Sequence, residues 1–151
     1  MRGYLTYCYC RQDSEKFEKL EEKTDPNFKE GTYTECHNDI RKRIQPGDFL
    51  FLRTNWKDTP YIIGYYEISE KRDGEFGKIL VAKNRICIDF NLQIDKELLA
   101  FLKPGLKIEM KPEKMSWAQY VNNTLGFRKY IILNEEKTKG LLNRIKQNGW
   151  N

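Results

Sequence analysis

The apolar positions of this chain are densest in two neighbouring runs that predict a central β-hairpin. Residues 49–53 and 61–68 are rich in β-branched and aromatic side chains, and Pro46-Gly47-Asp48 supplies turn chemistry before the first run. A polar loop over residues 54–60, which contains Trp56, joins them. Because apolar residues in both runs are nearly unbroken, we expect both faces of the two strands to be covered and the hairpin to lie at the centre of a sheet.

Shorter apolar or alternating runs on either side of this hairpin predict additional extended segments. They cover residues 3–10, 32–36, 78–81, 85–90, 106–110 and 129–133, of which the third and fourth form one strand or two. A turn over residues 71–74 separates the central hairpin from the later runs.

Polar capping residues mark the starts of several short helices. Asp13-Ser14, Asn38, Asp95 and Ser116 are the candidate caps. The predicted helices cover residues 15–23, 39–44, 96–101, 115–122 and 134–147. In the last helix Leu141, Leu142 and Ile145 face inward, and Asn148-Gly149 ends it.

Strands in mixed order with short helices predict an α+β fold, built on a curved mixed sheet or a small β-barrel with helices packed around it. The length of 151 residues suits one domain over residues 1–151, and no internal repeat or linker interrupts it.

The charge balance favours an anionic partner. There are 27 basic and 22 acidic residues, which gives a net charge of +5, a value that fits nucleic acid but also an ordinary Lys-rich surface. We see no secretory segment and no apolar stretch long enough to span a membrane, and the four Cys residues are typical of reduced thiols. We therefore expect a cytoplasmic protein without a membrane partner.

The cysteines and the single histidine do not predict a metal site or a catalytic nucleophile. Cys8 and Cys10 lack the two-residue spacing usual for zinc, and Cys36 and His37 are adjacent, so their side chains diverge on an extended segment. No phosphate loop and no nucleophile elbow is present. We expect no metal, no cofactor and no catalytic residue.

Basic and aromatic residues that alternate along the chain are the most informative feature. Together they suit a phosphate backbone and an unstacked base, although each residue singly also fits a core or surface role. Trp56, in its polar loop, is the hardest to place in a core. Asp89 interrupts an apolar strand, where it makes a structural hydrogen bond or reads an amino-bearing base edge. The phosphate-binding candidates are Arg41, Arg43, Arg53, Lys57 and Arg128.

Three motifs and their order resemble the PUA-like superfamily, in particular its EVE, YTH and nucleotide-modification-associated branches. The motifs are Thr34-x-Cys36-x-x-x-Ile40-Arg41, Ile44-x-Pro46-Gly47-Asp48-Phe49-Leu50-Phe51 and Ile62-Ile63-Gly64-Tyr65-Tyr66-Glu67-Ile68. The tail is also similar, with Phe127-Arg128, a short apolar run and a Glu-led helix. The aromatic-rich N-terminal signature of EVE domains is missing.

The resemblance implies a small curved sheet or barrel with a pocket for a flipped, often modified base of DNA or RNA. In the YTH branch an aromatic cage holds a methylated base, and Trp56 with Trp117 or Tyr33 would supply such a cage here. The candidate residues of the base pocket are Tyr33, Thr34, Cys36, Asn38, Trp56, Asp89 and Trp117.

We therefore expect a nucleic-acid-binding module that recognises a flipped, modified base without catalysis. The alternative is an ASCH-like enzyme of the same fold, a nuclease or amide hydrolase acting on RNA or nucleosides, with Cys36 as an outside nucleophile. A third reading is an interaction module with a vestigial pocket. The sequence leaves open which modification is read, whether DNA or RNA is bound, and whether a nuclease or helicase acts beside the chain.

Overall fold

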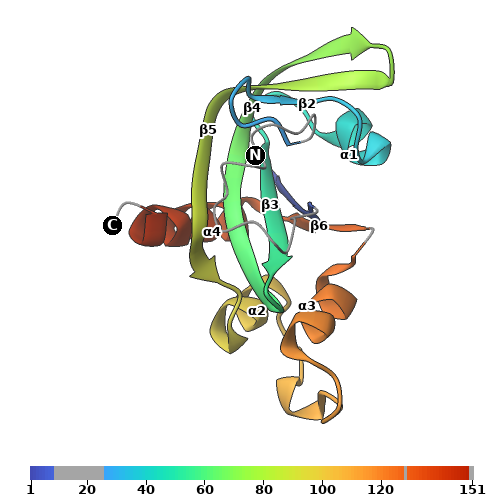
Figure 1. Ribbon diagram of the computed structural model, residues 1–151. Coiled ribbons are helices and arrows are strands. Elements are labelled where there is room, and N and C mark those ends of the chain that lie inside the picture. Colours follow the sequence, from blue (N-terminus) through green and yellow to red (C-terminus); the bar gives the residue numbers. More distant parts are fainter. Residues whose placement is uncertain (9–25, 128, 150–151) are drawn as a thin grey trace.

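Six strands form one mixed, open sheet, which makes the fold α+β (Figure 1). The structure is a computed structural model that describes residues 1–8, 26–127 and 129–149. The sheet order is β2-β5-β4-β3-β1-β6, and among these described strands β1 and β3 pair in parallel and the other neighbours antiparallel. Among the described residues the edge strands β2 and β6 are not paired, so the sheet does not close into a barrel. The strands are β1 (Gly3–Tyr7), β2 (Thr32–Tyr33), β3 (Phe49–Trp56), β4 (Thr59–Gly74), β5 (Gly77–Gln93) and β6 (Tyr130–Leu133).

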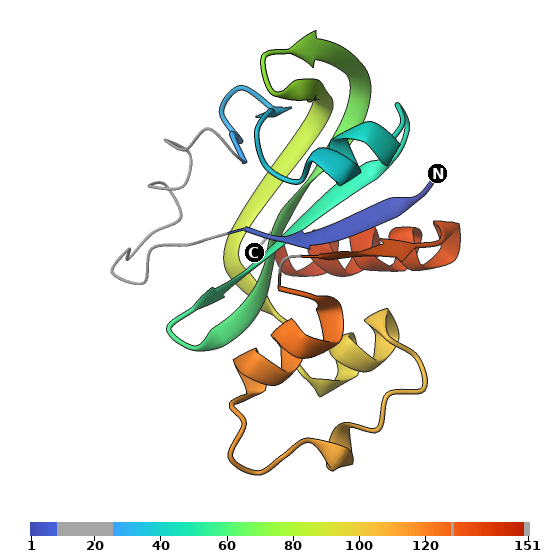
Figure 2. The same cartoon turned by 90° about the vertical axis from the view of Figure 1, so that its right-hand side faces the viewer.

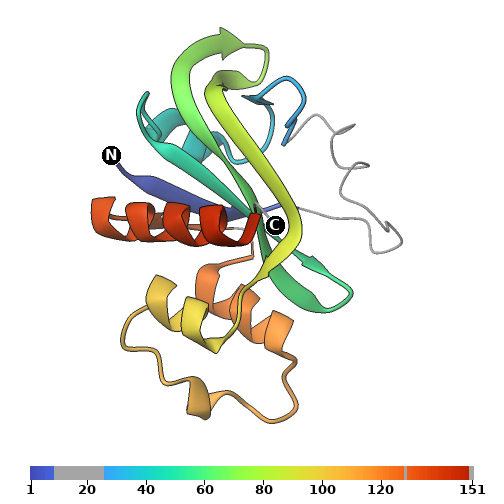
Figure 3. The same cartoon turned by 90° about the vertical axis from the view of Figure 1, so that its left-hand side faces the viewer.

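Short helices cover the sheet on both sides. Figure 2 shows α1 on one face and α2 beside α3 at one end, and Figure 3 shows α4 lying across the other face. The helical elements are α1 (Asn38–Arg43), α2 (Lys96–Leu102), the 3-10 turn η2 (Ile108–Met110), α3 (Trp117–Leu125) and α4 (Glu135–Gly149).

Alternate residues of β3 point into two separate hydrophobic cores. Phe49 and Phe51 pack with α2, α3 and α4, whereas Leu50 and Leu52 pack with α1 on the opposite face. All four side chains are buried because each face of the strand has its own cover. The prediction of a central hairpin covered on both faces is therefore confirmed.

The turns around this hairpin differ from the prediction. The prediction of a loop over residues 54–60 is wrong. The strands β3 and β4 extend into this segment, and a two-residue turn, Lys57-Asp58, joins them. Both residues have positive φ, 48° and 63°, which matches the twist of a tight two-residue hairpin. Trp56 thus belongs to a strand, paired with Thr59. Likewise, β4 runs through the predicted turn at residues 71–74, and β5 is one strand.

The predicted capping residues identified the starts of most of the described helices. Asp95 accepts from the backbone N–H of Leu98 at 2.8 Å and Ser116 from that of Gln119 at 3.1 Å, so both predicted caps are confirmed. The predicted Asn38 cap is displaced by one residue, since His37 precedes α1 and makes no side-chain cap bond. The predicted strand over residues 106–110 is wrong, because this segment ends in η2. The predicted helix over residues 15–23 lies outside the described residues.

One glycine is required where β4 pairs with β5. A Cβ atom on Gly64 would lie 2.1 Å from the carbonyl oxygen of Ile86, and the residue has a φ of 155°. The register between the two strands shifts beside it. Only glycine lets the backbones approach this closely, and the bulge bends the long β4–β5 pair.

Candidate functional site

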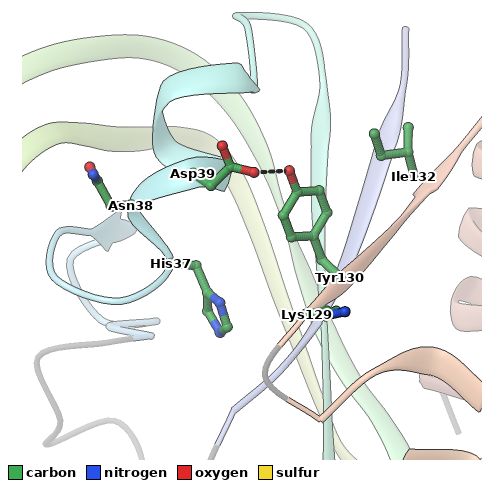
Figure 4. Close-up of a pocket in the computed structure, with 6 residues that line it drawn as sticks. All are labelled: His37, Asn38, Asp39, Lys129, Tyr130 and Ile132. Carbon is green, nitrogen blue, oxygen red and sulfur yellow. Dashed lines mark hydrogen bonds between the residues drawn. The ribbon is translucent and has the colours of Figure 1, made fainter. Parts of the chain in front are cut away.

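An open pocket of about 540 Å³ lies between the N-terminal end of α1 and β6 (Figure 4). We call it the α1–β6 pocket. It forms because β6 pairs antiparallel with β1, which carries the segment after α3 back to the side of the sheet that α1 covers. The described residues that line it are His37, Asn38, Asp39, Lys129, Tyr130 and Ile132.

The Asp39 carboxylate and the Tyr130 hydroxyl form the polar centre of the pocket. The hydroxyl donates to Asp39 Oδ2 (Figure 4), and Arg43 Nε lies 3.4 Å from the same oxygen. The hydrogen bond from Tyr130 is the main reason that the pKa of Asp39 lies below its ordinary value, and the Arg43 charge adds to the effect. Asp39 therefore stays ionised. Within the described residues no donor is bonded to its Oδ1, which is left to accept from a ligand.

His37 shapes the pocket wall through its backbone. Its φ of 49° and ψ of 63° lie in the left-handed region, which costs an ordinary residue about 1–2 kcal/mol. Its Nε2 lies 3.0 Å from Thr6 Oγ1, and its ring stacks parallel to that of Tyr33 at 6.4 Å. These contacts tie the strained residue to β1 and β2. Backbone strain of this kind clusters at functional sites.

Cations surround the pocket. Arg43 and Lys42 are exposed on α1, and Lys129 is exposed just before β6. The Lys71 ammonium of β4 also reaches α1, where it donates to the Lys42 carbonyl oxygen at 2.6 Å. A carboxylate acceptor inside a basic rim suits a ligand with N–H donors on one part and negative charge on another.

The predicted base-pocket residues of the segment before α1 separate into interior and surface positions. Tyr33 is buried, Thr34 is half-buried, and Cys36 and Asn38 are exposed. Asn38 is the predicted residue that lines the α1–β6 pocket. Figure 4 shows its side chain directed away from the Asp39–Tyr130 pair, so it faces the edge of the pocket rather than its centre.

Two of the predicted phosphate-binding residues, Arg41 and Arg53, are interior, and their assignment is corrected. Arg41 is 1% exposed and Arg53 0%, so neither guanidinium meets solvent. Arg53 donates to Asn122 Oδ1 at 2.9 Å and to the Gly126 carbonyl oxygen at 3.0 Å. Burial lowers the pKa of Arg53 to about 10. Both arginines hold backbone and side-chain oxygens together inside the fold.

Arg41 makes four hydrogen bonds, all to backbone carbonyl oxygens. The acceptors lie in the segment before α1, in the turn after β4 and at the start of β5; they are Glu35, Cys36, Phe76 and Lys78, at 2.9, 2.8, 2.9 and 2.7 Å. A guanidinium has five N–H donors, so little capacity remains for a phosphate.

The two predicted tryptophans pack against different cores and do not form one cage. Trp56 stacks on Phe90 with ring centres 4.2 Å apart, on the face that α1 covers. Trp117 stacks on Tyr120 and donates its Nε1 hydrogen to the Ile94 carbonyl oxygen at 2.7 Å, on the opposite face. A cage that combines them is therefore excluded by their places on the sheet.

The other predicted residues lie apart from the α1–β6 pocket. The Lys57 ammonium lies 4.5 Å from the centre of the Trp56 ring, at the β3–β4 turn. Asp89 is half-buried on β5 with a φ of 57°, and it is not among the residues that line the pocket. Arg43 is the predicted cation that lies near the pocket. Arg128 lies outside the described residues.

Sequence reasoning missed five of the residues that line the pocket: His37, Asp39, Lys129, Tyr130 and Ile132. Asp39 was noted as an acidic residue in the first turn of a predicted helix. The helix dipole favours an acidic residue there, so this position did not indicate a binding role. Tyr130 and Ile132 belong to a short apolar run that is typical of a core strand. Only the pairing of β6 with β1 places this run opposite Asp39.

The described residues provide no metal centre, since no three His, Cys, Asp or Glu side chains gather where they could hold an ion. The described cysteines are Cys8, Cys36 and Cys87, and none forms a disulfide. No helix in the described part of the chain is long and apolar enough to cross a membrane. In comparisons with known proteins, no family model and no curated protein matches the chain.

Proposed function

We propose that this chain is a PUA-like nucleic-acid-binding module that takes a flipped, modified base into the α1–β6 pocket. The observation that carries the proposal is the ionised Asp39 carboxylate, which lines an open pocket together with Tyr130 and accepts the Tyr130 hydroxyl hydrogen at Oδ2. The volume of about 540 Å³ lies within the roughly 300–1,000 Å³ usual for small-ligand sites.

A carboxylate acceptor selects the class of base. Adenine and cytosine present exocyclic amino groups that donate, whereas thymine and uracil present a carbonyl oxygen at that position, which Asp39 would repel. A singly methylated amino group keeps one N–H for Asp39. Its methyl group would find an apolar surface at Ile132, which is 46% exposed. The proposed ligand is therefore a base with an exocyclic amino group, and adenine and cytosine, plain or methylated on that group, are the bases tested below.

In this proposal the basic residues near the pocket add affinity for the phosphate backbone, which the pocket alone does not provide. Extruding a base costs a few kcal/mol, and phosphate contacts help to offset that cost. Lys42, Arg43 and Lys129 are exposed and flank the pocket. The polarity is consistent, because Asp39 is the one carboxylate among the described residues that line the pocket, and Arg43 lies next to it.

The test is fluorescence anisotropy with single- and double-stranded DNA and RNA, each plain or with methylated adenine or cytosine, at two salt concentrations. We expect the tightest binding to one modified adenine- or cytosine-containing strand, weakened by salt. Flat, weak binding to every strand would overturn the proposal, and turnover of RNA or nucleosides would then favour the enzyme alternative.

The variant Asp39→Asn separates base reading from charge. Removing a negative charge near a polyanion should strengthen binding, so simple electrostatics predicts a tighter complex. If Asp39 accepts from the base, the same variant should weaken binding to adenine or cytosine strands, by a factor that corresponds to about 1–3 kcal/mol.

Asp58→Asn is the matched control. It makes the same charge change at the β3–β4 turn, outside the α1–β6 pocket, and asparagine tolerates the φ of 63° there. It should leave binding unchanged or slightly stronger. Equal effects of the two variants would refute a role for Asp39 in base recognition.

A further inference from the structure

The long β4–β5 hairpin reaches past the rest of the sheet and bends over α1 (Figures 1 and 2). Its end is the two-residue turn Glu75-Phe76 between the paired Gly74 and Gly77. We call residues 74–77 the β4–β5 tip.

Hydrogen bonds from the buried Arg41 side chain hold the tip against α1. Two of the four bonds of Arg41 go to the tip and its flank, from Nη1 to the carbonyl oxygens of Phe76 and Lys78 at 2.9 and 2.7 Å. The other two go to Glu35 and Cys36, in the segment that leads into His37 and the α1–β6 pocket. One buried guanidinium thus fixes the tip and the pocket segment relative to each other.

The tip also borders a residue of the pocket. A Cβ atom placed on Gly77 would lie 3.1 Å from Asn38 Oδ1 and 3.5 Å from Arg41 Nη1. Gly77 has a φ of 101°, and its missing side chain lets the tip approach Asn38 closely. Asn38 lines the α1–β6 pocket, so the tip forms the neighbouring surface.

This braced tip presents an aromatic ring to solvent. Phe76 is 57% exposed, and its backbone is held by the Arg41 bond. Lys71 and Lys78 lie on the two strands that lead to it, and repulsion from Lys78 helps to lower the pKa of Lys71, after the larger effect of burial. Lys78 Nζ also lies 2.6 Å from Asp73 Oδ1, so the flanks of the tip carry charges of both signs, and the exposed Phe76 ring is the feature that distinguishes it.

We propose that the β4–β5 tip is a second nucleic-acid contact, where the Phe76 ring stacks on a base that neighbours the one in the α1–β6 pocket. The inference rests on the proposed function and extends it from a single base to a strand. Arg41 is a positioning residue, because it holds the ring at a set place relative to the pocket. Stacking on an aromatic ring tolerates every base, so the tip adds affinity without adding sequence preference.

The experiment compares two ligands of different length. One is adenosine or cytidine monophosphate, methylated as the preferred strand is, and the other is a five-nucleotide single strand that carries the same base at its centre. We expect Phe76→Ala to weaken binding of the five-nucleotide strand about five- to a hundredfold, and to leave binding of the monophosphate unchanged.

Three further variants distinguish stacking from shape. Phe76→Tyr and Phe76→Trp keep an aromatic face and should retain strand affinity, whereas Phe76→Leu keeps apolar bulk alone and should behave like Phe76→Ala. In Phe76→Trp, the strand should quench more tryptophan fluorescence than it does in the wild-type protein, and the monophosphate should not.

The outcomes separate this inference from the proposed function. Wild-type protein that binds neither ligand overturns both. Wild-type binding of the strand that Phe76→Ala leaves intact overturns the tip contact alone. Equal weakening of both ligands by Phe76→Ala also overturns it, because the ring would then support the pocket rather than a neighbouring base.

Discussion

Arg41 and Arg43 lie two residues apart on α1, and the structure assigns them opposite roles. Arg41 is buried with four bonds to backbone carbonyls, whereas the Arg43 side chain is 58% exposed beside Asp39. We therefore predict that Arg41→Met destabilises the fold with little direct effect on phosphate contacts, and that Arg43→Met does the reverse. Methionine is unbranched, favours helices and keeps much of the apolar stem.

The magnitude follows from the bonds that Arg41 makes. Hydrogen bonds that involve a charged group contribute about 1.5–3 kcal/mol each, so four would contribute about 6–12 kcal/mol before any compensation. Three acceptors belong to the exposed residues Glu35, Cys36 and Phe76, where water can replace part of the loss. We expect a net loss of about 3–4 kcal/mol, in the range measured when a buried charge network is broken. For a chain of this length that corresponds to a fall in Tm of roughly 6–16 °C.

The assay is thermal unfolding of wild type and both variants by circular dichroism, with urea unfolding as a check that the m-value is unchanged. Arg43→Met should keep its Tm within about 3 °C of wild type, because exposed ion pairs contribute little. It should also lower the slope of log K against log salt by about 1 for the preferred strand. If Arg41→Met instead kept the wild-type Tm and lowered the salt slope, Arg41 would be a phosphate ligand and the role assigned to its burial would be refuted.

Other contacts make equally specific predictions. Tyr130→Phe removes the main donor to Asp39, so the Asp39 pKa should rise toward its ordinary value of about 3.9, measured by NMR titration of its carboxyl carbon. Because the folded pKa is lowered in the wild type, the contribution of this bond to stability is present above about pH 4 and is lost as pH falls through the lower folded value. Trp56→Ala loses the stack on Phe90 and should lower unfolding free energy by about 1–2 kcal/mol in urea, with strand binding unchanged. Gly64→Ala should cost at least about 3 kcal/mol or prevent folding, because its Cβ would lie 2.1 Å from a carbonyl oxygen.

Each of these has a contrary result. An unchanged Asp39 titration in Tyr130→Phe would mean that the hydroxyl does not set the carboxyl pKa. If a folded Trp56→Ala protein no longer bound the nucleic-acid strand, Trp56 would have to be part of the base-binding site. A Gly64→Ala protein with wild-type stability would show that the Ile86 carbonyl oxygen leaves room for a side chain at Gly64.

Local chemistry accounts for the elements that were predicted correctly. Asp95 and Ser116 cap their helices through bonds to a backbone N–H three residues ahead, so the residues that decide these starts are neighbours in sequence. The hairpin of β3 and β4 was predictable for the same reason, since dense apolar residues in two nearby runs already require cover on both faces. The turn between these strands was misjudged because Lys57 and Asp58 lack the glycine that usually marks positive φ.

The roles of the basic residues depended on which way the helix turns. In α1 the buried positions are Ile40 and Arg41, followed by Ile44 just after the helix, whereas Lys42 and Arg43 are exposed. Arg41 lies next to Ile40 and about one helical turn before Ile44, so it borders the buried side of the helix. The sequence contains this phase, but two of the four carbonyl oxygens that make burial tolerable come from the β4–β5 tip and its flank, more than thirty residues away.

The sequence by itself therefore determined the α+β class, the central strands and most helix starts, because each depends on residues close together in the chain. The tertiary structure alone decided the site. Asp39 meets Tyr130, 91 residues later, because β6 adds to the free edge of β1. The same folding buries Arg53 and separates Trp56 from Trp117. A local sequence pattern does not predict these long-range contacts, because they depend on the strand order, and the strand order depends on how both hydrophobic cores pack.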